Sequence, residues 1–344
     1  MNIIRLPVTL FRCISISKKI AGQETYYPEL KRKHRLIRIM DNIRWKFKYK
    51  ETNEFYNSYG MDVKGVNPFN SKYIDNRSFI ESRNKLNSQQ TYSQNTLLRD
   101  KLLFFRYMRE VDIPVPAIFA VIFDGEFFDL NFQLIDIKNF KLKENYFIKD
   151  INGQCASCVV WIKNFEEYKR KKEMFIRGRF IVQESLMQCS EMNLLNSYSI
   201  NTMRLITIRD KCNNIKLFSG GLRIGTLQSG IVDNTSKGGI FVGIKADGCL
   251  NKYGFYKSNY GTKTHMHPDT RIEFEGFKIP YYNKAVEMVI NAHRFFYDLH
   301  SIGWDIAITE KGCVIIEGND NWEISSIQAC IGGAKAKWLN AIQE

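Results

Sequence analysis

The stretch GWDIAITEKGCVIIEGNDNW, residues 303–322, decides the fold of this chain. Two apolar runs, WDIAIT and CVIIEGN, are joined by the turn EKG, a pattern typical of an antiparallel hairpin. Side chains alternate between the faces of a strand, so Asp305 at the start of the first run should converge with Glu317 and Asn319 near the end of the second. Two carboxylates and an amide oxygen are ligands that suit Mg²⁺, and the hairpin therefore predicts a metal site.

The burial expected around Glu317 supports this prediction. The apolar run CVII precedes Glu317, which places the acid at the edge of a buried strand, where an unpaired charge is costly. A bound metal ion would remove that cost. The spacing alone leaves one alternative open, a surface hairpin whose acids face water.

The elements before this hairpin indicate the fold class. Apolar spacing predicts a helix over 96–110, a strand over 117–123, a charged helix over 165–175 and a long amphipathic helix over 283–303. The other apolar segments are seven β-rich runs: FDLNF, NYFIK, CVVWI, FIVQESL, NTMRLITIR, IKLFSGGLRIG and GIFVGIK. This order predicts an α+β fold with mainly antiparallel sheets. No GxGxxG or Walker-type GxxxxGK motif follows a strand, so Rossmann and P-loop folds are unsupported.

Composition and cysteine usage indicate a soluble, cytoplasmic protein. The chain has 344 residues, of which 44% are hydrophobic, and no apolar run approaches the roughly 20 residues that a membrane span requires. Its opening residues do not resemble a signal peptide. The eight cysteines are scattered, with a lone CxxC at Cys155 and Cys158, so neither disulfides nor a zinc site is expected.

Positive charge is concentrated at the N-terminus. Of the formal net charge of +14, residues 1–50 contribute +10, from thirteen Lys and Arg against Glu24, Glu29 and Asp41. Aromatic residues are interleaved with these charges. The pattern predicts contact with the inner face of an anionic membrane or with an acidic partner, and a solvated helical face is the alternative. No motif for specific nucleic-acid binding is present.

Four segments resemble the ATP-grasp superfamily, which includes D-alanine:D-alanine ligases, and they occur in the superfamily's order. The acidic hairpin resembles its metal-binding strands. Lys101 in LLRDKLLFF resembles the lysine of a helix that contacts ATP phosphate, Lys149 in NYFIKD resembles the second phosphate-binding lysine, and FIVQESL resembles the hinge strand that bonds adenine. The stretches SYSINTMRLITI, IVDNTSKGGIFVGI, HPDT and GWDIAIT are similar to recurrent blocks of the sugar-transfer associated ATP-grasp group. The resemblance runs from about residue 60 to the C-terminus.

This resemblance implies ATP and Mg²⁺ as cofactors, with the metal on Asp305, Glu317 and Asn319. Residues 150–158 would form the loop that covers the phosphates. The nucleotide contacts that it implies are Lys101 and Lys149 for the phosphates, backbone groups of Gln183, Glu184, Ser185 and Leu186 for adenine, and Glu191 for ribose. Connectors between helices and strands often carry such polar residues, so for Glu191 a plain connector residue is the alternative.

Three cations are candidates for the reacting centre. D-alanine ligases carry an arginine just before the first metal-binding aspartate, whereas this chain has Trp304 there, so Arg204 or Arg223 is the expected cation. Arg204 lies among apolar neighbours, where an anionic substrate group or a buried salt bridge would compensate its charge. Lys237 in DNTSKGG would hold phosphate or substrate, with a plain loop as the alternative. For His267, substrate recognition and turn capping both stay open.

The resemblance also implies a domain organisation. Composition predicts a basic helical region over 1–60, and the resemblance implies a region preceding the catalytic domain over 61–140 and an ATP-grasp domain over 141–344. Within that domain, 141–186 would be the small lobe that covers the nucleotide, and 187–344 the large lobe that holds metal and substrate.

The implied function is an ATP-dependent ligase. It would activate a small-molecule carboxylate as an acyl phosphate and join it to an amine, with release of ADP and phosphate. The resemblance further suggests a place in the biosynthesis of surface polysaccharides or of sugar and amino-acid conjugates. A kinase on the same scaffold and a non-catalytic nucleotide-binding module are the alternatives.

Overall fold

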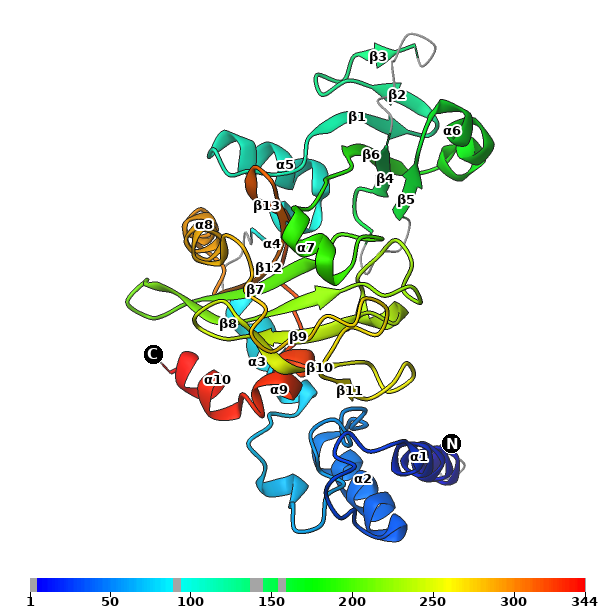
Figure 1. The fold of residues 1–344 in the computed structure, drawn as a ribbon, viewed down its shortest axis with the longest axis vertical. Helices are drawn as coiled ribbons and strands as arrows, with labels where there is room; N and C mark the ends of the chain where they lie inside the picture. The colour runs from blue at the N-terminus through cyan, green and yellow to red at the C-terminus, as the bar shows by residue number, and fades with distance from the viewer. Residues whose placement is uncertain (1–4, 89–93, 137–144, 154–158, 344) are drawn as a thin grey trace.

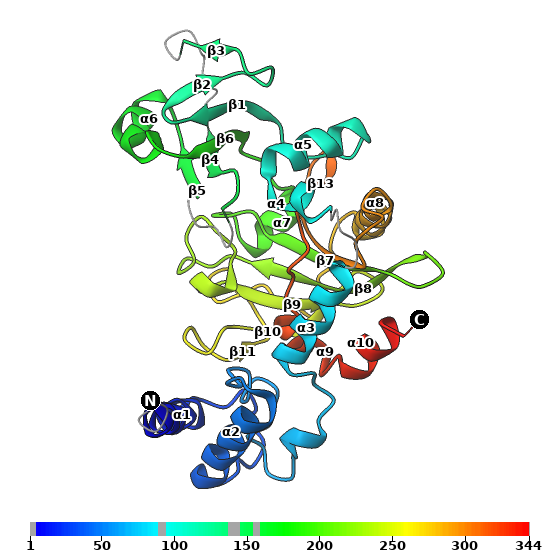
Figure 2. The same ribbon diagram turned by 180° about the vertical axis from the view of Figure 1, so that it is seen from behind.

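The computed structural model describes residues 5–88, 94–136, 145–153 and 159–343, and Figures 1 and 2 show their arrangement from two sides. Two antiparallel sheets follow one another along the long axis, and a group of N-terminal helices lies at the end opposite the smaller sheet. This architecture confirms the expected α+β fold class. Within the described residues, no helix combines the length and apolar character needed to cross a membrane.

The small sheet has six antiparallel strands, in the order β3-β2-β1-β6-β4-β5. Its strands are β1 (Ile118–Phe123), β2 (Glu126–Phe128), β3 (Leu134–Ile135), β4 (Tyr146–Asp150), β5 (Val159–Ile162) and β6 (Arg179–Glu184). The helix α6 (Phe165–Lys171) and the 3-10 helix η2 (Lys172–Phe175) pack on it through Tyr168 and Phe175. The charged helix expected over this segment is therefore present.

Two expectations for this lobe differ from the structure. β1 pairs with β6, so residues 118–135 belong to the small sheet, and the lobe begins well before the expected boundary. The run FDLNF is expected as a strand, but beyond Phe128 it forms a turn, because the carboxylate of Asp129 accepts N–H bonds from Asn131 and Gln133. Side-chain bonds of this kind compete with strand pairing.

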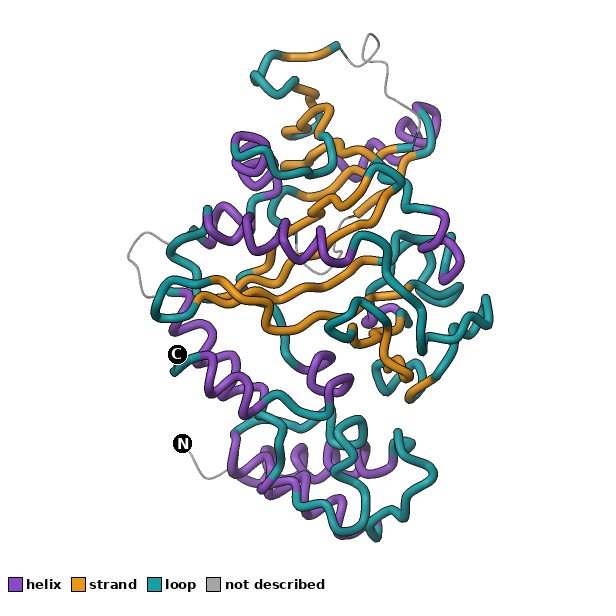
Figure 3. The backbone as a smooth tube through the Cα atoms, turned by 60° about the vertical axis from the view of Figure 1, so that its left-hand side comes forward, coloured by secondary structure: helices purple, strands orange, loops and turns teal. Residues whose placement is uncertain are grey.

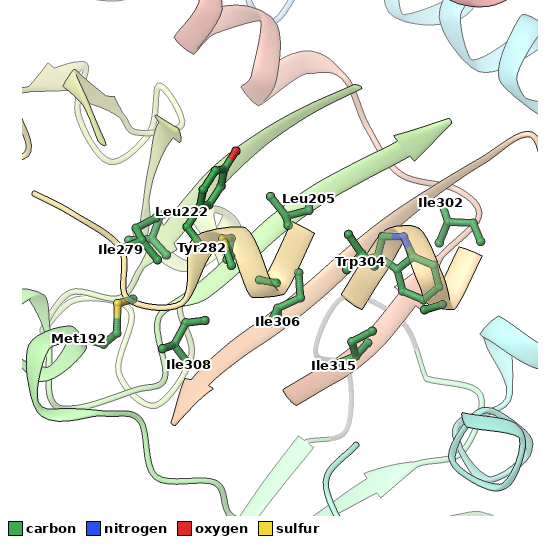
Figure 4. Close-up of a cluster of buried hydrophobic side chains, with 14 of the residues drawn as sticks. Met192, Leu205, Leu222, Ile279, Tyr282, Ile302, Trp304, Ile306, Ile308 and Ile315 are labelled. Atoms are coloured by element: carbon green, nitrogen blue, oxygen red, sulfur yellow. The ribbon is translucent and has the colours of Figure 1, made fainter. Parts of the chain in front are cut away.

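The large sheet has seven antiparallel strands, in the order β11-β10-β9-β8-β7-β12-β13. They are β7 (Thr202–Arg209), β8 (Ile215–Ile224), β9 (Ile240–Ile244), β10 (Leu250–Phe255), β11 (Lys263–Thr264), β12 (Ser301–Thr309) and β13 (Gly312–Asn319). The helix α8 (Tyr282–Arg294) packs on β7, β8 and β12, and Figure 4 shows core side chains there, including Leu205, Trp304 and Ile306. This core fixes the central strands that carry the candidate site.

A helix is expected over 283–303, but α8 ends at Arg294. Residues 301–303 instead begin β12 and pair with β7. The sheet supplies these residues with the backbone hydrogen bonds that a longer helix would otherwise provide. Because the helix ends early, β12 can begin at Ser301 and includes Asp305.

The helix expected over 96–110 is divided at Asp100 into α4 (Asn95–Arg99) and α5 (Lys101–Glu110). Asp100 has an extended backbone, and its carboxylate accepts the N–H groups of Leu102 and Leu103 as an N-cap. The break places Lys101 in the first turn of α5, where its N–H donates to the Ile151 carbonyl at 3.1 Å. A predicted phosphate-binding lysine is thereby attached to the small lobe.

The N-terminal helices gather at one end of the molecule, as Figure 3 shows. The remaining helical elements are α1 (Arg5–Gly22), α2 (Arg35–Tyr49), η1 (Pro68–Asn70), α3 (Asn76–Asn87), α7 (Ser190–Leu195), η3 (Thr235–Lys237), α9 (Ser325–Ile331) and α10 (Lys335–Ala341). α3 falls in the region expected to precede the catalytic domain, and its Phe79 packs against Trp322 and Trp338 of the large lobe. Between α1 and α2, the Tyr26 hydroxyl donates to the Tyr256 carbonyl at 2.9 Å, which ties the N-terminal region to the β10–β11 loop.

Candidate active site

A bulge in the β12–β13 hairpin brings the two acids of the predicted metal motif face to face. The ladder runs in step from the turn as far as the pair Ile306 and Ile315. It then shifts by one residue, so that Ile316 is passed over and Asp305 pairs with Glu317. Paired residues of an antiparallel ladder point to the same face, so the bulge puts both carboxylates on one side of the sheet.

Two arginines bind Asp305, which has only 3% of its surface exposed. Arg204 of β7 forms a bidentate ion pair with it, through Nε at 2.5 Å and Nη2 at 2.8 Å, and Nη1 of Arg223 of β8 lies 2.9 Å from the same carboxylate. Burial alone would raise the pKa of Asp305, but the two guanidinium groups hold that pKa well below its usual value. Arg204 thus has the buried salt bridge that the sequence leaves open as an alternative.

Glu317 makes a different set of contacts. Among the described residues it forms no ion pair, and its Oε1 accepts a bond from the Asn319 amide at 3.2 Å. Burial, and then the charge of Asp305, raise the pKa of Glu317 above its usual value. Positive charge brought beside such a carboxyl group lowers its pKa. An added cation beside Glu317 would supply that charge.

The donor set fits Mg²⁺ that is held in part by phosphate. Glu317 and Asn319 face the cavity described below, and Asp305 lies behind Glu317. In the part of the chain that the structure describes, no cluster of three or more His, Cys, Asp or Glu side chains could hold a metal. Glu317 and Asn319 offer oxygen atoms to the cavity, whereas both carboxylate oxygens of Asp305 are bonded by Arg204 and Arg223. A bound Mg²⁺ would take its other ligands from water and phosphate oxygens, as Mg²⁺ usually does. When bound, the ion would neutralise phosphate charge.

The two predicted phosphate-binding lysines approach from the small lobe. Nζ of Lys101 donates to the Gly153 carbonyl at 2.6 Å, and Nζ of Lys149 donates to Oε1 of Gln183 at 2.7 Å. Burial lowers the pKa of both lysines, that of Lys149 to about 8, while the charge of Glu317 opposes the shift in each. Both ammonium groups therefore lie in the field of the predicted metal-binding carboxylate.

A cavity of about 360 Å³ between the lobes collects most of the predicted site residues. Those that line it are Lys101, Lys149, Gln183, Arg204, Arg223, Glu317 and Asn319. Four of these side chains are cationic, and they come from both lobes. The cavity is thus suited to a ligand with several negative charges.

Residues 80–344 match the family described as sugar-transfer associated ATP-grasp. The chain belongs to the sugar-transfer associated ATP-grasp family. This membership makes it an ATP-binding protein of the ligase-type ATP-grasp fold, and it confirms the resemblance drawn from the sequence. No curated protein matches the chain significantly.

Solved ATP-grasp structures share distant similarity with the chain. The biotin carboxylase domain of the Hydrogenobacter thermophilus 2-oxoglutarate carboxylase, solved with MgADP and bicarbonate, is 14% identical, with a TM-score of 0.44 and coverage of 72% of this chain and 45% of that one. The D-alanine-D-alanine ligase from Coxiella burnetii is 9% identical, with a TM-score of 0.41 and coverage of 72% of this chain and 57% of that one. The L-amino acid ligase from Bacillus licheniformis is 12% identical, with a TM-score of 0.42 and coverage of 72% of this chain and 48% of that one. The chain thus spans about half the length of these structures.

The segment FIVQESL, expected as the hinge strand, includes most of β6, and two of its side chains bond to protein groups. The carboxylate and N–H of Glu184 both bond Ala117, at 3.0 Å and 2.8 Å, so Glu184 holds the start of β1. The side chain of Gln183 accepts a hydrogen bond from Lys149, whereas only backbone contacts to adenine were expected of this residue. Within the described residues, Glu184, Leu186 and Glu191 do not line the cavity, so their nucleotide contacts remain predictions.

The DNTSKGG loop lines the cavity through residues other than the predicted Lys237. Asn234, Thr235 and Ser236 line it, whereas Lys237 is exposed and, among the described residues, is not part of its lining. Gly239 is required for packing, because a Cβ there would lie 2.3 Å from the Asp233 carbonyl oxygen. The resemblance of the whole DNTSKGG block to the family could have pointed to these three residues.

Lys257 also lines the cavity, at the side formed by the β10–β11 loop. The Tyr260 hydroxyl donates to the Ser236 carbonyl at 2.9 Å and joins this loop to the DNTSKGG loop. No motif marked Lys257, because a lone lysine among turn residues is usually a solvated surface charge.

Two further candidates have structural explanations or lie outside the described residues. The ring of His267 is buried, its Nδ1 accepts the N–H groups of Asp269 and Thr270, and its Nε2 lies 2.8 Å from the Gly225 carbonyl. Of the two alternatives, turn capping is therefore the observed role. Cys155 and Cys158, with most of the predicted phosphate-covering loop, lie outside the described residues.

The lowered pKa of Lys149 predicts that ATP binding weakens with rising pH. Phosphate favours the charged lysine, so binding raises the pKa above its free value of about 8, and affinity falls as pH rises through that value. Titration calorimetry with ATP from pH 7 to pH 9 would measure the change. The variant Lys149→Met should bind ATP more weakly and lose most of this pH dependence; an unchanged profile would contradict the assignment.

Proposed function

We propose that this protein is an ATP-dependent carboxylate–amine ligase that acts through an acyl phosphate. The observation that carries the proposal is the cavity, in which four cationic side chains from two lobes surround Glu317. ATP and a carboxylate substrate are both anions, and a site that brings them together must offset their mutual repulsion. Membership of the ATP-grasp family supports the dependence on ATP.

The proposed reaction has two steps. A carboxylate oxygen of the first substrate attacks the γ-phosphorus of ATP, the bond to the β,γ-bridging oxygen breaks, and ADP leaves. The amine of the second substrate then attacks the carbonyl carbon of the acyl phosphate, and the carbon–oxygen bond breaks to release inorganic phosphate and one proton. The product is an amide, and no enzyme nucleophile is required.

The side chains divide this work by position. Lys101 and Lys149 would bind ATP phosphates, because both side chains line the cavity beside the small lobe and carry positive charge. Arg204 and Arg223 would stabilise the transferring phosphoryl group, and their ion pairs with Asp305 keep the guanidinium groups in place beforehand. Lys237 would reach the substrate only if its loop closes over the cavity.

The test is ADP release by the purified chain with ATP and Mg²⁺, across amino acids, polyamines and uronic acids, with mass spectrometry of the products. Substrate-dependent ADP release with a product equal to two substrates less water supports the ligase. A product heavier by one phosphoryl group would identify a kinase instead. Tight ATP binding without turnover on any substrate of the panel would favour the nucleotide-binding module.

We further propose a cellular setting. The family description suggests that the acid or the amine is a sugar or is linked to one, as in surface-polysaccharide biosynthesis. The basic charge of residues 1–50 suggests that the enzyme works in the cytoplasm, at the inner face of an anionic membrane or beside an acidic partner. Polysaccharide analysis of a deletion strain would test the first suggestion.

A further inference from the structure

Helix α2 buries Asp41, Asn42 and Trp45 on its inward side and exposes apolar side chains on its outward side. Its buried residues include Asp41, whose carboxylate accepts from Lys33 at 2.6 Å and from the Tyr56 hydroxyl at 2.8 Å. Asn42 is also buried and donates to the Arg38 carbonyl at 2.9 Å. These contacts fix the orientation of the helix, because rotating it would leave a buried carboxylate without its partners.

The opposite face of α2 carries four exposed apolar side chains. The exposed fractions are 66% for Leu36, 52% for Ile37, 47% for Met40 and 59% for Phe47. At 3.6 residues per turn, these side chains lie within one broad stripe, about 16 Å long at 1.5 Å per residue. A contiguous exposed apolar stripe of this kind marks an interaction surface.

Positive charge accompanies the stripe. Arg44 is exposed and falls within the stripe by helical periodicity, and Lys48 is exposed at the edge of the stripe, with Nζ 5.4 Å from the centroid of the Phe69 ring. Within residues 11–50 the exposed cations are Arg12, Lys18, Lys19, Lys31, Arg35, Arg44, Lys48 and Lys50. The exposed acids in this segment are Glu24 and Glu29, and Glu29 is paired with Lys263 at 3.1 Å.

We infer that α2 is a docking surface for an anionic lipid bilayer, with the helix lying parallel to the membrane plane. Apolar side chains would enter the acyl boundary, while the neighbouring cations contact phosphate headgroups. Figures 1 and 2 show α1 and α2 at the end of the molecule farthest from the small lobe, where a flat partner can approach the helix. This inference deepens the proposed setting by naming the partner and the surface, and it does not depend on the ligase chemistry.

The test measures co-sedimentation of the full chain with phosphatidylcholine vesicles, with and without phosphatidylglycerol, in the absence of nucleotide. We expect at least tenfold stronger partition into the anionic vesicles, reduced by added salt. The triple variant Leu36→Ser, Met40→Ser, Phe47→Ser should lower partition about tenfold or more, and Arg44→Glu with Lys48→Glu should lower it in low salt. The matched control replaces exposed apolar residues elsewhere: Leu134→Ser, Met174→Ser and Tyr297→Ser.

Three results would overturn the inference. They are equal binding to neutral and anionic vesicles, an equal loss in the control variant, and light scattering that shows a wild-type dimer which the triple variant converts to monomer. The last result would assign the stripe to a second copy of the chain. Circular dichroism and melting of each variant separate loss of binding from loss of folding. Because no ATP is present, failure here leaves the ligase proposal untouched, and absence of turnover leaves this one untouched.

Discussion

Replacing Glu317 with glutamine is expected to lower substrate-dependent ADP release by about 100-fold or more. The change keeps the shape of the side chain but removes the negative charge that the proposed Mg²⁺ would bind. A metal ion supplies several kcal/mol of charge stabilisation in such reactions, and each 1.36 kcal/mol corresponds to about tenfold in rate. The measurement is a coupled ADP assay over a range of Mg²⁺ concentrations, in which the variant should also need more Mg²⁺.

The control for this prediction is Glu287→Gln, which makes the same chemical change on the exposed side of α8. It should leave both the rate and the Mg²⁺ requirement at the wild-type values. If Glu317→Gln releases ADP at the wild-type rate, the metal assignment is wrong. A lower rate with an unchanged Mg²⁺ requirement would place Glu317 in another role.

The second large effect concerns folding. Asp305→Asn is expected to lower the free energy of unfolding by about 3–5 kcal/mol, because the change removes the anion that compensates two guanidinium groups. Arg204, with 8% of its surface exposed, has little access to water as a substitute. Guanidinium denaturation followed by tryptophan fluorescence would measure the loss.

Asp112→Asn is the matched control for this second prediction. Asp112 is exposed and has a positive φ of 55°, a conformation that asparagine tolerates well. The free energy of unfolding of the Asp112→Asn variant should stay within about 0.5 kcal/mol of the wild-type value. A chain with Asp305→Asn that is as stable as this control would show that the arginines do not depend on the carboxylate.

The hairpin shows how far the sequence alone leads. The turn EKG predicts the hairpin that brings Asp305 near Glu317 and Asn319, and the structure places these residues near one another. A hairpin without a bulge would instead pair Asp305 with Ile316 and turn Glu317 to the opposite face. The bulge that corrects the register depends on packing between the strand and its neighbours, which no local pattern encodes.

The sequence predicts Arg204 or Arg223 as the cation of the reacting centre, but it does not identify Asp305 as their partner. Trp304 occupies the position where related ligases carry arginine, and its ring is buried in the core with its N–H donating to Thr207 Oγ1 at 2.8 Å. Arg204 reaches the same carboxylate from the adjacent strand, because β7 and β12 pair Arg204 with Asp305. Strand pairing between segments a hundred residues apart sets this contact, so spacing within one segment could not show it.

The N-terminal region supports the β10–β11 loop, which carries Lys257 at the cavity, although among the described residues the N-terminal helices do not line the cavity themselves. Tyr26 bonds Tyr256 at 2.9 Å and Gln23 bonds Ser258 at 3.1 Å, on either side of Lys257, which lines the cavity. A shortened protein that begins at residue 80, where the family match begins, would lose both contacts and the first turn of α3 with Phe79. Such a fragment would keep Lys101 and Lys149, but the loop that carries Lys257 would lose its support, so ligand binding measured on the fragment would not represent that of the whole chain.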